Sequence, residues 1–258
     1  MELSKRLQAV ADLLSEGLKV ADIGCDHGFL SIYLVQVGKV SGCIAMDVNR
    51  GPLQRAEENI DRQGLSTYIE TRLSDGANAL NIGEAEAAVL AGMGGKLMIR
   101  IIEDSLEKFL RMQEFILQPQ SEIALVRQFI RQIGCRITGE DMVLEEGKFY
   151  PMMRVETGDF QNPAQSALWK KERISSQQAA GHGSDRDQQE LFDAFGECLL
   201  RNRHPVLKQF LEKEKKLQEE ILTALEEQSS LRSRQRRKEI EARLEKIQQG
   251  LEWFTDEV

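Results

Sequence analysis

Residues able to bind a ligand gather in one short stretch near the amino terminus. Asp22, Gly24, Asp26, His27 and Gly28 stand between an apolar run and a segment with helical spacing. Glycines between a strand and a helix let the backbone turn tightly and bring a ligand against the amino end of the helix. An aspartate occupies the middle position of the G-x-G-x-G pattern, so the turn alone leaves ordinary turn chemistry and ligand binding equally open.

Two more acidic positions stand where neighbouring strands would end. Asp47 closes the second apolar run, where a carboxylate can accept both hydroxyls of a ribose. Asp75-Gly76 follows the third run, where an acid could read an adenine amino group. The anionic pyrophosphate of a dinucleotide would be repelled by Asp22 and Asp26, whereas the cationic end of S-adenosylmethionine would be attracted. The charges therefore favour S-adenosylmethionine over NAD, although each acid alone could cap a helix or face solvent.

A glycine-rich segment, Ala91-Gly92-Met93-Gly94-Gly95, ends the fourth expected strand. Methyl transfer is an in-line displacement, and the small residues here would leave space for a flat base close to the cofactor. Amino-directed base methylases usually present Asn or Asp followed by two prolines at this point. Because this chain has neither, a ring nitrogen with its own lone pair is the more natural target.

These observations predict two sets of site residues. The alternatives are that His27 is a turn residue with no chemical part, and that Met93 fills the core at a glycine-rich helix start. The predicted catalytic residues are Asp26, His27, Met93 and Gly94. The predicted cofactor-binding residues are Asp22, Gly24, Cys25, Asp26, His27, Gly28, Asp47, Val48, Asn49, Asp75, Gly76, Ala91, Gly92 and Met93.

The elements that must position these residues follow an α/β pattern in residues 1–157. Short apolar runs alternate with segments of helical period, which predicts a Rossmann-like, mostly parallel sheet with helices on its faces. Expected strands are Lys19–Ile23, Val40–Asp47, Ile69–Leu73, Ala87–Ala91 and Phe115–Leu117. Expected helices are an opening one stopped by Gly17, Phe29–Val37, one capped by Asn49 with Gly64 past its end, Gly95–Phe109 and Ser121–Ile133.

An antiparallel hairpin is expected to close this sheet. Cys135–Leu144 and Phe149–Thr157 are separated by only four residues, which can close a hairpin but cannot hold a crossover helix. Such a hairpin also favours the S-adenosylmethionine cofactor over a dinucleotide.

Residues 158–258 form a second expected domain, a linker followed by a helical coiled coil. Gly158–Asp187 is polar and predicts a linker with some helix. The later apolar positions are spaced for two long helices, interrupted near Ser229-Ser230 and Ser233, which favours an antiparallel helical hairpin over one rod. The spacing rests on Phe210, Leu217, Ile221 and Ala224, and on Ile240, Leu244, Ile247, Leu251 and Phe254.

Composition excludes several classes of protein. The chain has 258 residues, and 34 Lys and Arg against 42 Asp and Glu give a net charge of −8, which argues against a small basic nucleic-acid clamp. No apolar stretch is long enough to span a membrane. The four cysteines form no Cys-x-x-Cys pair, so we expect no metal site, no disulfide framework and a cytoplasmic location. A monomer is favoured, with the oligomeric state left open.

Basic residues nevertheless cluster in the helical region. Local patches steer polyanions regardless of net charge, so these cations could contact RNA. The alternative is a solvated helix surface paired with acids such as Glu239 and Glu241. The predicted RNA-binding residues are Arg201, Arg203, Arg232, Arg234, Arg236, Arg237 and Lys238.

Several of these segments together resemble the bacterial tRNA (adenine-22-N1)-methyltransferase family. The resemblance covers residues 1–157 well and the helical tail in character. It implies a class I S-adenosylmethionine-dependent enzyme with a C-terminal coiled coil that methylates N1 of adenine 22 in tRNA. The matching segments are Ser4–Leu7, Ala21–Gly28, Ala91–Gly95, Ile116–Pro119 and Leu144–Tyr150.

Two other classes of function stay open. A methyltransferase acting on a small molecule or a protein would share the cofactor turn but would not need the basic tail. A non-catalytic adaptor that binds S-adenosylmethionine would use the tail for partners and would not depend on Gly94-Gly95.

Overall fold

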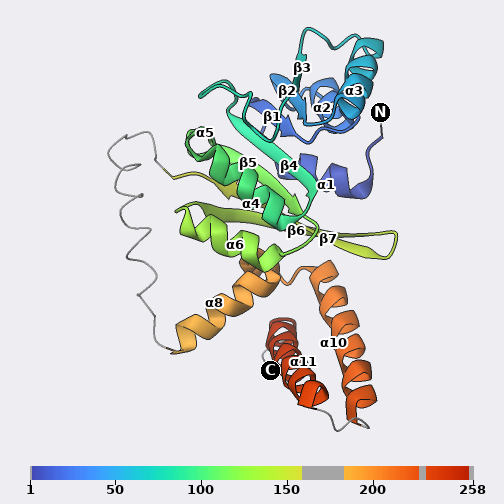
Figure 1. Ribbon diagram of the computed structural model, residues 1–258, viewed down its shortest axis with the longest axis vertical. Coiled ribbons are helices and arrows are strands. Elements are labelled where there is room, and N and C mark those ends of the chain that lie inside the picture. The colour runs from blue at the N-terminus through green and yellow to red at the C-terminus, as the bar shows by residue number, and fades with distance from the viewer. Residues whose placement is uncertain (1, 159–182, 227–230, 256–258) are drawn as a thin grey trace. The chain divides into compact units, whose positions relative to one another are not determined.

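The chain divides into two units, Met1–Ala180 and Gly181–Val258 (Figure 1). The computed structural model describes residues 2–158, 183–226 and 231–255. The expected polar linker falls mainly on residues 159–182, which lie outside the described residues.

A single sheet organises the described part of the first unit. Its seven strands follow the order β3-β2-β1-β4-β5-β7-β6, and β1 to β5 are mutually parallel while β7 runs antiparallel to both of its neighbours. The predicted α/β fold with a closing hairpin is confirmed. The strands are β1 Lys19–Ile23, β2 Gly42–Asp47, β3 Ile69–Leu73, β4 Ala87–Met93, β5 Glu114–Pro119, β6 Arg136–Glu145 and β7 Lys148–Glu156.

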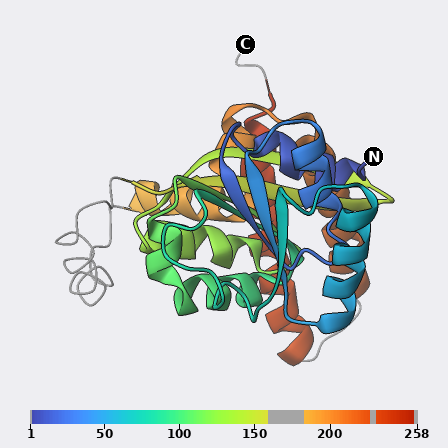
Figure 2. The same cartoon turned by 90° about the horizontal axis from the view of Figure 1, so that it is seen from above.

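Helices cover both faces of the sheet (Figure 2). Side chains alternate along each strand, so Ala21 and Ile23 of β1 pack into one core layer while Val20 packs into the other. One layer is completed by α1 Lys5–Leu13, α2 Phe29–Gln36 and α3 Arg50–Arg62. The other is completed by α4 Gly95–Asp104, α5 Leu106–Leu110 and α6 Ile123–Gln132.

Three local predictions for this unit were wrong in detail. The helix expected at Gly95–Phe109 is broken at Ser105, whose φ of −126° and ψ of 28° end α4 and begin α5. The opening helix ends before Gly17, because Leu14 is already extended. The hairpin turn is shorter than expected, since Glu146 and Gly147 both have positive φ, which suits a two-residue turn.

The described part of the second unit is helical. Its elements are α8 Gly183–Phe195, α9 Glu197–Arg201, α10 Pro205–Glu226 and α11 Leu231–Glu252. Helices α10 and α11 are antiparallel, because the side chain of Lys215 bonds to Gln248 while the carbonyl of Leu225 bonds to Arg237. None of the described helices is long and apolar enough to cross a membrane.

The seam between α10 and α11 differs from the predicted one. Leu217 is 46% exposed, whereas Leu207 and Leu211 are fully buried. Ser233, expected to interrupt the seam, is itself buried, and Ile240 and Ile247 are buried as predicted. The other expected interruption, Ser229-Ser230, lies outside the described residues. The α10 seam therefore starts nearer Pro205 than the seven-residue spacing indicates.

Candidate active site

A cavity of about 330 Å³ lies at the carboxyl ends of β1 and β4. The strand order reverses direction between these two strands, since β2 lies on one side of β1 and β4 on the other. Open α/β sheets bind their ligands at such switch points. The cavity is lined by Arg6, Leu7, Asp22, Gly24, Cys25, Asp26, His27, Phe29, Leu30, Ala91, Gly92 and Gln120.

The glycine turn after β1 is held tightly against its neighbours. Gly24 and Gly28 have φ of 79° and 71°, a region that favours glycine. The Gly24 and Cys25 amides both donate to the Met46 carbonyl, at 2.8 and 2.9 Å, which fixes the turn on β2. A methyl group on Gly24 would lie 3.1 Å from Met93 Cε. The backbone thus stays close to the cavity because no side chain intervenes.

Asp22 places a carboxylate in the cavity wall. The residue is only 4% exposed, and one oxygen accepts a 2.7 Å hydrogen bond from the Ser31 hydroxyl. Burial raises the pKa of Asp22 to about 6, while the hydrogen bonds with Ser31 counteract this and the charge of Asp47 adds to it. At neutral pH the cavity therefore carries a buried negative charge.

Asp26 and His27 stand next to each other at the cavity. Asp26 adopts φ of 49° and its side chain is 70% exposed, with its carboxylate 3.6 Å from His27 Nε2. The His27 ring stacks on the Phe29 ring. The backbone carbonyl of His27 accepts a 3.0 Å hydrogen bond from the Asn59 side chain. The imidazole is thus oriented by its neighbours, a geometry that suits both a ligand contact and a simple turn residue.

A second group of predicted residues lies at the ends of β2 and β3 and does not line this cavity. Asp47 is 9% exposed, and its carboxylate accepts a 2.8 Å hydrogen bond from the Asn49 amide. Val48 is exposed. Asn49 occupies the N-cap position of α3, as predicted, but its side chain makes no capping hydrogen bond. Asp75 is exposed, with Arg100 at 3.9 Å.

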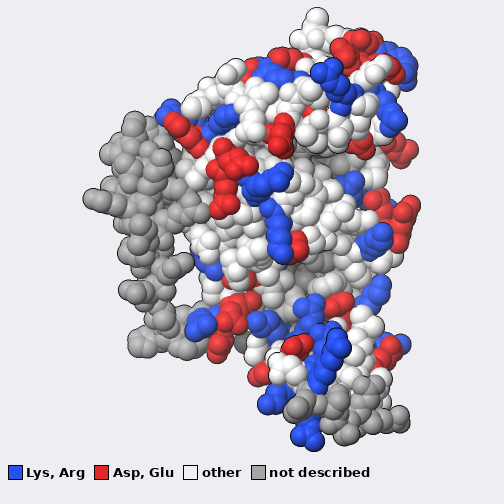
Figure 3. Space-filling view, viewed as in Figure 1, with Lys and Arg blue, Asp and Glu red and all other residues white. Residues whose placement is uncertain are grey.

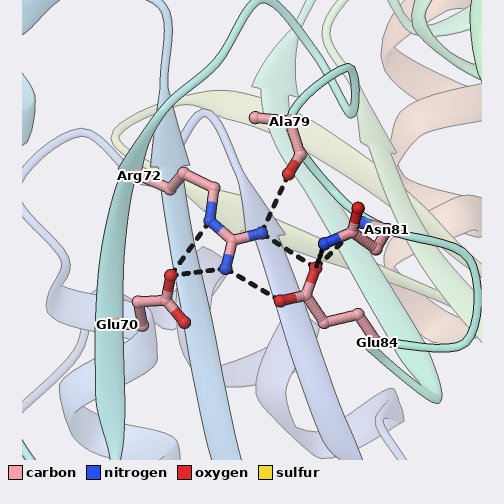
Figure 4. A network of polar contacts seen from close by, with 5 residues as sticks. All are labelled: Glu70, Arg72, Ala79, Asn81 and Glu84. Carbon is pink, nitrogen blue, oxygen red and sulfur yellow. Dashed lines mark hydrogen bonds and ion pairs between the residues drawn. The ribbon is translucent and has the colours of Figure 1, made fainter.

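An arginine network anchors the loop that carries Asp75-Gly76 (Figure 4). Arg72 donates to the Ala79 carbonyl at 2.9 Å and to both Glu84 oxygens at 2.8 Å. These hydrogen bonds lower the pKa of Glu84 to about 2. Ser74 continues the network, accepting from the Ala79 amide and donating to the Gly76 carbonyl. Residues of this loop that follow Asp75, the acid predicted to bind adenine, are therefore hydrogen-bonded to Arg72 of β3 and to Ser74.

The segment at the end of β4 divides into two parts. Gly92 has φ of 78° and donates its amide to Gln118 Oε1 at 3.0 Å, beside the cavity. Methyl groups on Gly94 and Gly95 would lie 3.1 and 2.5 Å from Ser121 atoms. The expectation that these two glycines leave open space for a base was wrong, because they serve close packing against Ser121. The described residues lining the cavity include neither Met93 nor Gly94.

Sequence reasoning assigned no role to several residues at the cavity. Arg6, Phe29 and Gln120 line it, and Gln118 supports it from β5. Gln118 and Gln120 could have been recognised from the sequence, because they are polar residues at the carboxyl end of the apolar strand β5. Among the described residues, no group of three or more His, Cys, Asp or Glu is arranged to hold a metal.

The predicted RNA-binding cations have unequal surroundings. Figure 3 shows Lys and Arg side chains gathered on the visible face of the helical unit. Arg201 pairs with Glu197 at 2.8 Å and Arg236 with Glu239 at 3.1 Å. Arg237 is half-buried and donates to the Leu225 carbonyl, so its side chain joins α11 to α10. Arg203 has φ of 48° and further contacts.

Three of the exposed cations on α11 differ from Arg236 in their surroundings. The described residues give no ion-pair partner to Arg232, Arg234 or Lys238. They therefore form the accessible part of the predicted cluster, and we call them the α11 cations.

The sheet order, the glycine turn and the acid at the end of β2 define the class: a Rossmann-like domain that binds a nucleoside cofactor at its switch point. Residues 3–153 match the family model described as "Methyltransferase domain", and the chain belongs to this family.

Within this family, the chain is similar to individual tRNA methyltransferases. The tRNA (adenine(22)-N(1))-methyltransferase of Bacillus subtilis (strain 168) is 36% identical over 159 residues, covering 62% of this chain and 67% of that protein. A crystal structure of the B. subtilis m1A22 tRNA methyltransferase has a TM-score of 0.77 at 27% identity and covers 97% of this chain and 99% of that one.

A Streptococcus pneumoniae protein assigned to the same kind of enzyme has been crystallised in complex with S-adenosyl-L-methionine. Its TM-score is 0.76 at 30% identity, covering 97% of this chain and all of that one. The resemblance drawn from the sequence motifs is confirmed.

Proposed function

We propose that this chain transfers a methyl group from S-adenosylmethionine to N1 of adenine 22 in tRNA. The observation that carries the proposal is the cavity at the switch point, where buried Asp22 and the Gly24 turn face the end of β4. The relatives named above support the reaction and the substrate.

The residues present fit this cofactor. Asp22 and Asp26 make the cavity wall acidic, which suits a ligand with a sulfonium and an ammonium group and disfavours an anionic pyrophosphate. Side chains at Gly24 and Gly28 would contact Met93 and Ala56 closely. Glycine at these positions therefore lets the backbone of the turn come close to the cofactor. In this proposal Asp22 and the 24–28 turn hold the amino-acid end, Asp47 the ribose hydroxyls, and Asp75 the adenine.

For this methyl transfer, the main task of the protein is to align the methyl group with N1 of the adenine. S-Adenosylmethionine supplies a methyl group on a sulfonium centre, and N1 of neutral adenine has an in-plane lone pair, so no strong base is required. The chain must orient the base, exclude water and stabilise the cationic product through carbonyls and carboxylates. Asp26, His27 and the backbone around Met93 are the groups proposed for this. The base must also be swung out of its stack to reach the cavity.

We propose that the tRNA contacts the helical unit through the α11 cations, because exposed cations can neutralise RNA phosphates and thereby release the counterions condensed on the RNA. We place the activity in the cytoplasm, with a monomer acting without metal or membrane. Burial raises the pKa of the Cys25, Cys43 and Cys135 thiols, so these side chains stay protonated at neutral pH.

A labelling experiment tests the reaction. The protein is incubated with methyl-labelled S-adenosylmethionine and unmodified tRNA, and the modified base is mapped by its block to reverse transcription. Label in N1-methyladenine at position 22, absent when adenine 22 is replaced by guanine, is expected. Label at another base or in protein would contradict the substrate. Cofactor binding without any label would indicate a non-catalytic adaptor.

A further inference from the structure

Gln120 brings a side-chain amide to the switch-point cavity. The residue follows directly after β5, is exposed, and lines the cavity together with Gly92. Its backbone N–H donates to the Met93 carbonyl at 2.9 Å, which fixes the residue against the end of β4. A methyl group on Gly92 would lie 3.8 Å from Gln120 Nε2. The amide therefore lies beside the place where a side chain of residue 92 would begin.

The two glutamines at the end of β5 have different surroundings. Gln118 is fully buried, and its Oε1 accepts from Arg6 Nη1 at 2.9 Å and from the Gly92 amide at 3.0 Å. Its Nε2 donates to the Pro119 carbonyl at 3.3 Å. The Gln120 side chain forms no hydrogen bond within the described residues. Gln118 thus holds the cavity wall together, whereas the acceptor and the donor of the Gln120 amide are available to a ligand.

The α1 side of the cavity is supported by the closing hairpin. The Arg6 guanidinium carbon lies 5.7 Å from the centre of the Tyr150 ring, within the range of a cation–π contact. The Lys5 amide donates to the Glu145 carboxylate at 2.6 Å. The hairpin therefore fixes this side of the cavity without engaging the Gln120 amide.

The proposed reaction limits which edge of the target base the protein can read. N1 must face the methyl group, so a side chain bonded to N1 would block the attack. The neighbouring edge of adenine presents the N6 amino group as a donor and N7 as an acceptor. A glutamine amide pairs with these two atoms, because Oε1 accepts from N6 while Nε2 donates to N7. Guanine presents two acceptors on this edge, O6 and N7, and can form only one of the two bonds.

Resting on the proposed function, we infer that Gln120 selects adenine as the target base by accepting from N6 and donating to N7. A neutral amide suits this place. A carboxylate has no donor for N7, and a cation would repel the positive charge of the methylated base. Gln120 then determines specificity for the base, while the acids of the cavity wall, Asp22 and Asp26, face the cationic cofactor.

The test compares two substrates that differ at one atom of the target base. Full-length tRNA carries either adenine or 7-deazaadenine at position 22, the latter with a C–H group in place of N7. We expect Gln120→Leu to lower kcat/KM on the adenine tRNA about 10- to 100-fold. The kcat/KM ratio of adenine over 7-deazaadenine should be about three- to tenfold larger in the unaltered chain than in this variant. Comparing ratios removes any effect of the substitution on N1 itself.

Two further variants separate the contact from a folding defect. Gln120→Glu keeps an acceptor for N6 but has no donor for N7, so it should retain part of the activity and show the same ratio as Gln120→Leu. Gln132→Leu is the control, because this exposed glutamine at the end of α6 does not line the cavity. Its kcat/KM and its ratio should match those of the unaltered chain, with thermal melting verifying the fold of each variant.

Three outcomes would contradict these assignments. Equal ratios in the unaltered chain and Gln120→Leu would overturn the inference, because the amide would then not contact N7. Calorimetry with S-adenosylhomocysteine provides the second readout. A loss of affinity in Gln120→Leu as large as the loss in kcat/KM would overturn the inference too, since Gln120 would then serve the cofactor. If the unaltered chain bound S-adenosylhomocysteine but methylated neither tRNA, the proposed function itself would fail.

Discussion

The Ser31 hydroxyl donates a 2.7 Å hydrogen bond to the Asp22 carboxylate in the interior of the first unit. One neutral donor compensates only part of the cost of burying a charge, so the Asp22 pKa stays at about 6. This carboxylate is retained although the core would be more stable without it, which fits a residue needed for binding.

Replacing Asp22 with Asn should alter the pH dependence of stability. The folded-state pKa of about 6 lies above the model value of 3.8, so the stability from this group is fully present below pH 3.8 and is lost as the pH rises through 6. Relative to the unaltered chain, Asp22→Asn should therefore gain roughly 2 kcal/mol in the free energy of unfolding between pH 4 and pH 8. Urea denaturation at both pH values measures this. A difference independent of pH would contradict the role of burial.

Alanine substitutions at two glycines separate backbone strain from site geometry. Gly24 and Gly38 have φ of 79° and 69°, but only at Gly24 does an added methyl group meet a neighbour, Met93. Both variants should lose about 1–2 kcal/mol of stability to left-handed strain. Only Gly24→Ala should also lose more than about tenfold in affinity for S-adenosylhomocysteine, since its strain lies in the cavity wall. Calorimetry measures the affinity of both variants for S-adenosylhomocysteine. An equal loss of affinity in Gly38→Ala would show that the loss in Gly24→Ala does not come from the cavity wall.

The Arg72 network should govern the order of the loop after β3. Arg72→Met removes the donor to the Ala79 carbonyl and leaves Glu84 with Asn81 as its donor, and we expect a loss of about 1–3 kcal/mol in stability. Hydrogen exchange should increase in residues 75–84, and cofactor affinity should fall severalfold because Asp75 is less well placed. Arg111→Met removes an exposed pair with Glu107 and serves as the control. Unchanged exchange in this loop would refute the anchoring role.

The α11 cations should matter more for tRNA than their paired neighbours. Changing Arg232, Arg234 and Lys238 to Gln should weaken tRNA binding at least about tenfold and reduce the salt dependence by about two released counterions. The matched control changes three cations that already pair with acids to Gln. Filter binding across a salt series measures both, and cofactor affinity should be unaffected. Equal losses in the two triple variants would argue against a specific RNA surface. The control residues are Arg201, Arg236 and Arg243.

The sequence predicted those features that depend on neighbouring residues. The parallel strands follow from their apolar runs, and the closing hairpin follows from its short connection. The Gly24 turn is a local backbone requirement that glycine reveals directly. The structure places Asp22 in the cavity wall beside it, as its position in β1 indicated.

Features that depend on distant residues could not be predicted. Gly95 is glycine because Ser121 crowds it, and the break at Ser105 falls within an apparently continuous helical pattern. Arg6 reaches the cavity only through Gln118 and Tyr150, far along the chain. In the second unit, Leu217 fits a seven-residue period yet is exposed, because packing and not spacing selects the buried face.

The contacts of α1 with the closing hairpin affect when the site forms during synthesis. The Lys5 amide bonds to Glu145 and the Arg6 guanidinium lies over Tyr150, so the earliest helix is completed by the last strands of its sheet. Such pairings between distant residues form late. A growing polypeptide on the ribosome therefore lacks these two contacts to α1 until the hairpin has left the exit tunnel.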